Sequence, residues 1–161
     1  MRLWHKSLIS VLPRKQLLAQ WRECCAIASN IATKGEPNHL LVNKVLEYSD
    51  SDFIAYSMLV RSEMGRRGYI VSKRSERDFQ INMYKAAKWF TPYEQVDHGM
   101  LYDTWHNDRY FWQCYYNLEE KYDCGGITKE EFDSIRAMAV KKYENSIHGV
   151  VIGLEGVKNG K

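Results

Sequence analysis

The chain has 161 residues, of which 45% are hydrophobic and 27% charged, and its formal net charge is +3. This length is sufficient for one domain with its own core, and two domains would be cramped. No signal peptide is recognisable and no apolar stretch approaches a membrane span, so we expect a soluble cytoplasmic protein that does not enter a membrane.

The apolar residues recur with a helical period along almost the whole chain. A short irregular arm precedes Pro13, and an amphipathic helix follows until Gly35 and Pro37 interrupt it. Further helices are predicted over about 39–47, 50–68, 74–90, 104–124 and 128–145, and the glycine-rich residues 147–161 are expected to form a flexible or edge tail. We therefore predict an all-α fold, a compact single-domain bundle of five to six helices over residues 1–161.

Specific residues mark the predicted helix ends. Asp50 or Ser51 can cap the third helix, Thr91-Pro92 should stop the fourth, and Thr104 should open the fifth. Thr128 followed by Glu131 forms a capping-box pattern for the last helix.

Positive charge is concentrated in two segments. Residues 1–34 carry six cations against Glu23 alone, and residues 61–77 carry six cations against two glutamates, so the remainder of the chain is acidic. Two basic segments on an acidic body would suit a polyanion such as double-stranded DNA, if the fold brings the segments together. Two solvated helix faces are the plainer interpretation of the same pattern.

Neither the cysteines nor the histidines have metal-ligand spacing. The four cysteines include no C-x-x-C pair, and the five histidines are scattered without acidic or thiol neighbours at ligand distance. We expect reduced thiols, no metal and no cofactor.

A second stripe of side chains follows the apolar face of the first long helix. If Leu17 and Trp21 face the core, then Gln16, Gln20 and Glu23 lie one position behind, near the boundary between core and solvent. An acid at such a boundary with cations nearby could transfer protons or stabilise positive charge. A surface glutamate on a basic helix is the alternative.

The segment LISVLPRKQLLAQWRE resembles the opening of the pyrimidine-dimer DNA glycosylase (endonuclease V-like) family. That family has an N-terminal arm, a leucine-rich turn and a helix bearing an aromatic-Arg-Glu triplet, here Trp21-Arg22-Glu23. The resemblance covers about the first 25 residues. The opening MRLWH and the stretch WHNDRYFWQCYYNLEEKYDCGG also look like an uncharacterised bacterial and phage subgroup of the same family.

This resemblance implies a DNA glycosylase with AP lyase activity on damaged or modified pyrimidines. The α-amine at the chain start, here on Met1, would attack the sugar C1′ carbon, expel the base and form a Schiff base that undergoes β-elimination. Glu23 would assist the proton transfers, while Arg2, Lys15 and Arg22 would contact DNA.

The chain departs from the family pattern at its start. Arg2 is too large for ordinary removal of the initiator methionine, and Lys15 and Gln16 replace the glutamine and histidine of the family. The first change leaves the amine on Met1, one residue further from Glu23 than in the gapless family register, and the second places the lesion preference in question.

The aromatic segment 105–122 allows two interpretations. Its rings could stack on an extruded base, with His106 and Asp108 lining a pocket beside Gln16 and Gln20, or they could be buried core. The packing rule favours the core. A non-catalytic helical DNA-binding or protein-interaction module on the same scaffold is the alternative to the enzyme, and the protein partners and oligomeric state are not indicated by the sequence.

Overall fold

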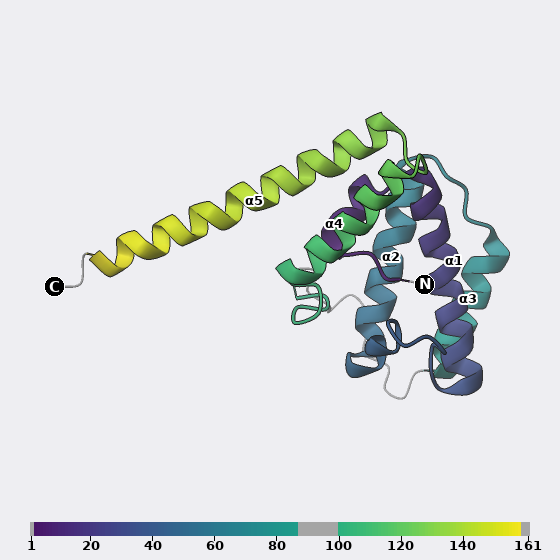
Figure 1. Ribbon diagram of the computed structural model, residues 1–161. Coiled ribbons are helices and arrows are strands. Elements are labelled where there is room, and N and C mark those ends of the chain that lie inside the picture. Colours follow the sequence, from purple (N-terminus) through teal and green to yellow (C-terminus); the bar gives the residue numbers. More distant parts are fainter. Residues whose placement is uncertain (1, 87–99, 159–161) are drawn as a thin grey trace. The chain divides into compact units, whose positions relative to one another are not determined.

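The computed structural model describes the backbone of residues 2–86 and 100–158, and the side chains of these ranges up to residue 144. The described residues form helices and no strand, as the sequence predicted (Figure 1). None of the described helices is long and apolar enough to cross a membrane. The elements, in chain order, are η1 (Lys6–Val11), α1 (Arg14–Lys34), η2 (Asn43–Glu47), α2 (Asp50–Arg66), α3 (Lys73–Ala86), α4 (Asp108–Asp123) and α5 (Lys129–Lys158).

The chain divides into two compact units, Met1–Cys114 and Tyr115–Lys161. The first unit contains the N-terminal arm, η1, α1, η2, α2, α3 and the first turns of α4. The second contains the remainder of α4 and α5. A single domain over residues 1–161 stays a prediction.

Helix α1 packs against α2 and α3 in the first unit (Figure 1). Leu17 and Trp21 face the core as predicted, Cys24 and Ala28 are buried on the same stripe, and Ile31 at its end is half-buried. The Trp21 ring lies 5.5 Å from the ring of Phe79 on α3. Burying each large apolar side chain contributes about 1.5–3 kcal/mol, so this stripe fixes α1 as the central helix of the unit.

The helix ends follow local chemistry, with some shifts from the prediction. Gly35 ends α1 at φ 80°, and its N–H donates to the carbonyl of Ile31. Ser49 caps α2 in place of Asp50 or Ser51, because its hydroxyl accepts the Asp52 N–H while the Asp52 carboxylate accepts the Ser49 N–H. The helix predicted over 39–47 is reduced to the short η2.

The later boundaries also differ in part. Helix α4 begins at Asp108 and not at Thr104, because the side-chain oxygen of Asn107 accepts the N–H of Tyr110 and caps the helix there. The predicted end of the fourth helix near Phe90 lies outside the described residues.

In the second unit, the capping box of Thr128 and Glu131 is confirmed by reciprocal hydrogen bonds of 3.2 and 3.3 Å. Helix α5 continues to Lys158, so the predicted end of the last helix near residue 145 is wrong, while a flexible or edge tail over 147–161 stays a prediction. No proline interrupts this run, and its glycines are isolated. Each glycine costs a helix only about 1 kcal/mol, which does not break the backbone ladder.

Candidate active site at the chain start

The N-terminal arm is buried against three helices of the first unit. Leu3, Trp4 and His5 are 1%, 6% and 2% exposed, respectively. The Trp4 N–H donates to the side-chain oxygen of Gln20 on α1 at 3.1 Å, and the Trp4 carbonyl accepts the hydroxyl of Tyr56 on α2 at 2.8 Å. Backbone groups held on both sides in this way fix the register of the arm against α1.

The third anchor comes from the first turns of α4. The Tyr110 hydroxyl donates to the Leu3 carbonyl at 2.5 Å. Burial raises the pKa of Tyr110, so the hydroxyl keeps the proton that it donates. Tyr110 therefore binds the carbonyl that lies closest to the chain start among the anchored groups.

His106 secures the next part of the arm. Its ring stacks on His5 with centroids 5.2 Å apart, its Nδ1 accepts the Lys6 N–H at 2.9 Å, and its carbonyl oxygen lies 2.7 Å from His5 Nε2. Desolvation, together with the charges of His5 and Lys6, lowers the pKa of His106 to about 2. His106 is therefore neutral at every physiological pH.

The pocket expected around residue 106 stays a prediction. His106 is 4% exposed and is packed among other rings, whereas Asp108 is exposed at the first residue of α4. An acid–base pair of His106 and Asp108 stays a prediction, and the burial of one member does not favour it.

Glu23 lies beside the chain start. One oxygen of its half-buried carboxylate accepts the backbone N–H of Arg2 at 3.2 Å. Met1 itself lies outside the described residues. The first described backbone amide of the chain is thus hydrogen bonded to the one acid of the basic segment 1–34.

Of the two glutamines before Glu23, Gln16 lies near the core–solvent boundary as predicted and Gln20 does not. Gln20 is fully buried, and its side-chain oxygen accepts the Trp4 N–H. Its amide nitrogen has no partner among the described residues. Gln16 is half-buried, and its side-chain oxygen also lacks a partner there. Gln20 is therefore part of the arm anchor and not a group at the core–solvent boundary.

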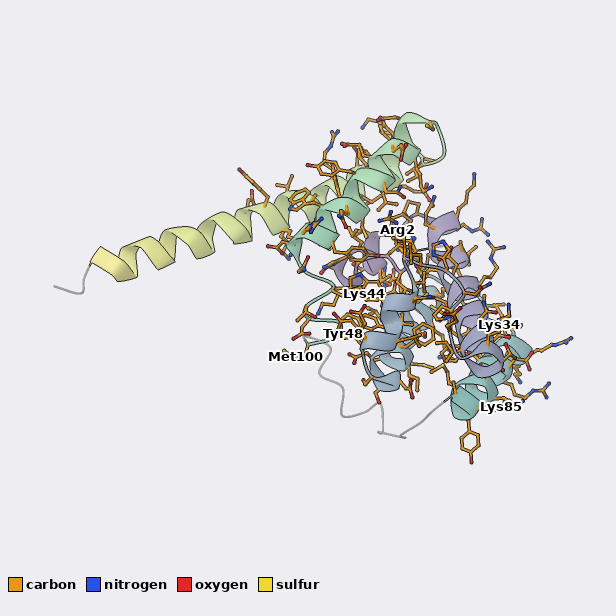
Figure 2. All side chains as sticks on the ribbon, turned by 60° about the horizontal axis from the view of Figure 1, so that its bottom comes forward. Arg2, Lys34, Lys44, Tyr48, Lys85 and Met100 are labelled. Carbon is orange, nitrogen blue, oxygen red and sulfur yellow. The ribbon has the colours of Figure 1, made fainter. Side chains whose placement is uncertain are left out.

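The predicted DNA-contacting cations divide into two kinds. Lys15 and Arg22 are exposed on α1, and neither forms an ion pair with a described carboxylate. Arg2 is half-buried, with its guanidinium carbon 5.8 Å from the centre of the Trp4 ring (Figure 2). Lys15 and Arg22 are therefore accessible to DNA phosphates, while the Arg2 guanidinium already contacts the Trp4 ring of the arm.

Sequence reasoning missed two of the arm anchors. The sequence does not single out Tyr56, and it places Tyr110 only within the aromatic segment 105–122, whose rings could stack on a base or be buried core. The Tyr110 ring instead lies 5.5 Å from Trp105 and 5.2 Å from His106. No local signal could identify these anchors, since their hydrogen bonds join positions 52 and 107 residues apart.

The described residues contain no group of three His, Cys, Asp or Glu side chains that could hold a metal ion. The four cysteines are free thiols in the described part of the chain. Burial raises the pKa of Cys24 to about 12 and that of Cys25 to about 11, so neither is a thiolate at neutral pH.

Residues 1–77 match the family model described as pyrimidine dimer DNA glycosylase. This match supports the family suggested by the opening residues. It covers the arm, α1 and α2 and ends within α3, and so includes Glu23 and the Arg2 amide. No curated protein and no solved structure matches the chain. The match supports a role of the pyrimidine-dimer DNA glycosylase type, in DNA repair, with DNA as the substrate.

Proposed function

We propose that this protein is a bifunctional DNA glycosylase and AP lyase that uses the α-amine of residue 1 as its nucleophile and Glu23 as the proton-transferring acid. The substrate class is a damaged or modified pyrimidine in double-stranded DNA, such as a UV pyrimidine dimer. The amine would attack C1′, the base would leave, and the resulting Schiff base would undergo β-elimination that cleaves the strand.

One observation carries this proposal: the 3.2 Å hydrogen bond between the Arg2 N–H and the Glu23 carboxylate. The proposed nucleophile is one residue of chain, at most about 3.6 Å, from the Arg2 amide that this carboxylate binds. A carboxylate in that position can stabilise positive charge on the opened sugar and accept the proton removed in the elimination. The anchored arm supports the same arrangement, because it does not need to become ordered when DNA binds.

An α-amine suits this chemistry at neutral pH. It titrates near pH 8 when unperturbed, so a substantial fraction is unprotonated under physiological conditions. Nitrogen is required at this position because only an amine forms an imine with the sugar.

The decisive experiment is borohydride trapping of protein with a native N-terminus on UV-irradiated, abasic and undamaged duplexes. We expect a covalent product on a damaged duplex that maps to residue 1. N-terminal extension should abolish it, and Tyr84→Phe, a change at an exposed tyrosine of α3, is the matched control that should leave it intact. Salt-sensitive DNA binding without trapping on any duplex would instead support a non-catalytic DNA-binding module.

A further inference from the structure

We propose that Tyr110, which lies beyond the family match, is a positioning residue that holds the N-terminal nucleophile beside Glu23. This inference rests on the proposed function and adds to it a contribution from the second half of the chain. Residues 1–77 provide the arm and the acid. Of the hydrogen bonds to carbonyls of residues 3 and 4, the one nearer the chain start comes from residue 110.

Tyr110 shares with Gln20 the peptide group of the arm that lies nearest to Arg2 among those that α1, α2 and α4 bind beyond residue 2. Its hydroxyl binds the carbonyl of Leu3, whereas Gln20 and Tyr56 bind the N–H and carbonyl of Trp4. Leu3 immediately follows Arg2, the residue whose amide reaches Glu23. The Leu3 carbonyl and the Trp4 N–H belong to one planar peptide group, so Tyr110 and Gln20 hold the same group from its two sides, whereas Tyr56 holds the next group along the chain.

The surroundings of Tyr110 give its hydroxyl a fixed direction. The ring is packed against Trp105 and His106, both of which are buried. His106 is in turn tied to the arm through the Lys6 N–H. His106 therefore contacts both the Tyr110 ring and the arm. Such packing keeps the Tyr110 hydroxyl in one orientation, within the tolerance that catalysis requires.

The chemistry implies an effect on rate and not on DNA affinity. Tyr110 is half-buried and its hydroxyl is occupied by Leu3, so it is not a DNA-contacting group in this arrangement. Loss of the hydroxyl removes one of the two hydrogen bonds that hold the peptide group between Leu3 and Trp4. A displacement of about 1 Å at a reacting group can lower a rate about 100-fold.

The test is Tyr110→Phe, with single-turnover borohydride trapping on an abasic-site duplex at saturating protein. We expect the trapping rate to fall about 10- to 100-fold, with the dissociation constant for DNA unchanged. Tyr48→Phe is the matched control, because it removes a tyrosine hydrogen bond of 2.6 Å, to Thr104, and Tyr48 lies apart from Arg2 (Figure 2). Its trapping rate should equal that of the unmodified protein.

Rate and amplitude separate positioning from misfolding. A variant that is only less stable loses trapped fraction at an unchanged rate, whereas a mispositioned amine reaches the full fraction slowly. An unchanged rate in Tyr110→Phe, or an equal loss in Tyr48→Phe, would overturn the inference while leaving the proposed function intact. Failure of the unmodified protein to trap at all would overturn the proposed function itself.

Discussion

The two basic segments of this chain are similar in charge but differ in how their cations are used. Lys15, Arg22 and Lys34 of the first segment are exposed and form no ion pair with a described carboxylate. The arginines of the second segment are paired with nearby acids, in the pairs Arg61–Glu76, Arg66–Glu63, Arg67–Glu63, Arg74–Asp78 and Arg77–Asp78.

The pairs around Glu63 show what the second segment contributes. Glu63 is 7% exposed and is bound by Arg66 and Arg67. The Arg67 guanidinium also donates to the carbonyls of Leu12 and Ser10, which end η1. Arg67 therefore holds the turn between the arm and α1, and Arg66 binds Glu63, so the density of positive charge in a segment does not by itself indicate a DNA-binding surface.

The largest expected effect comes from replacing the acid of the first basic segment, Glu23, and comparing it with an acid of the second, Glu76. Glu23→Gln should lower the rate of strand cleavage on damaged duplex at least about 100-fold, because the proton-transfer group is lost. The glutamine keeps an oxygen that can accept the Arg2 N–H, so the fold should be retained. Single-turnover cleavage measures the effect. Glu76→Gln, which removes the partner of Arg61, is the control and should cleave normally.

Glu63→Gln should instead lower stability and spare the chemistry. We expect a loss of about 2 kcal/mol in the free energy of unfolding at neutral pH, because a buried carboxylate with two arginine partners is removed. Urea denaturation measures this loss. Strand cleavage that falls as far as in Glu23→Gln, at equal folded fraction, would contradict the division between the segments.

The pH dependence of Glu63 follows from its pKa. Burial alone would raise that pKa, but the hydrogen bonds and charges of Arg66 and Arg67 outweigh it and lower the pKa below 4.5. The stabilisation is therefore complete above pH 4.5 and is lost as the pH falls through the lower folded-state value. The stability difference between the unmodified protein and Glu63→Gln should shrink over this acid range.

His106 predicts a second acid transition, at higher pH. Its pKa is about 2 in the folded protein and 6.5 ordinarily, so its stabilisation is present above pH 6.5 and is lost as the pH falls below that value. Each pH unit below 6.5 should cost up to about 1.4 kcal/mol. Denaturation midpoints over this range should fall less steeply in His106→Asn, which retains an acceptor for the Lys6 N–H. Equal slopes would exclude His106 as the source.

The smallest expected effects concern DNA affinity. If Lys15 and Arg22 contact phosphates, replacing each with alanine should lower the salt dependence of binding by about 0.9 in the slope of log K against log salt. Arg74→Ala, which removes a cation paired with Asp78, should change the slope less. Binding titrations at several salt concentrations measure both. An equal reduction in the Arg74 variant would remove the distinction between the segments.

Local patterns predicted much of the fold. The helix from Pro13 to Gly35, its buried stripe and the capping box at Thr128 all follow from residues within four positions of each other. The candidate acid could also be identified early, since Glu23 is the one carboxylate among the cations of residues 1–34. The continuation of α5 over residues 147–158 could not be predicted, because isolated glycines weaken a helix without ending it.

The sequence by itself determined the all-α architecture, the position of Glu23 on the first long helix and the resemblance of the opening to a DNA repair family. The tertiary structure alone decided that the arm is anchored, that Gln20 and His106 are anchors, and that Tyr110 reaches Leu3. The physical reason is the separation in sequence between the interacting residues. Helical periods and caps depend on neighbours within a turn or two, whereas hydrogen bonds between distant residues form only after the helices have packed.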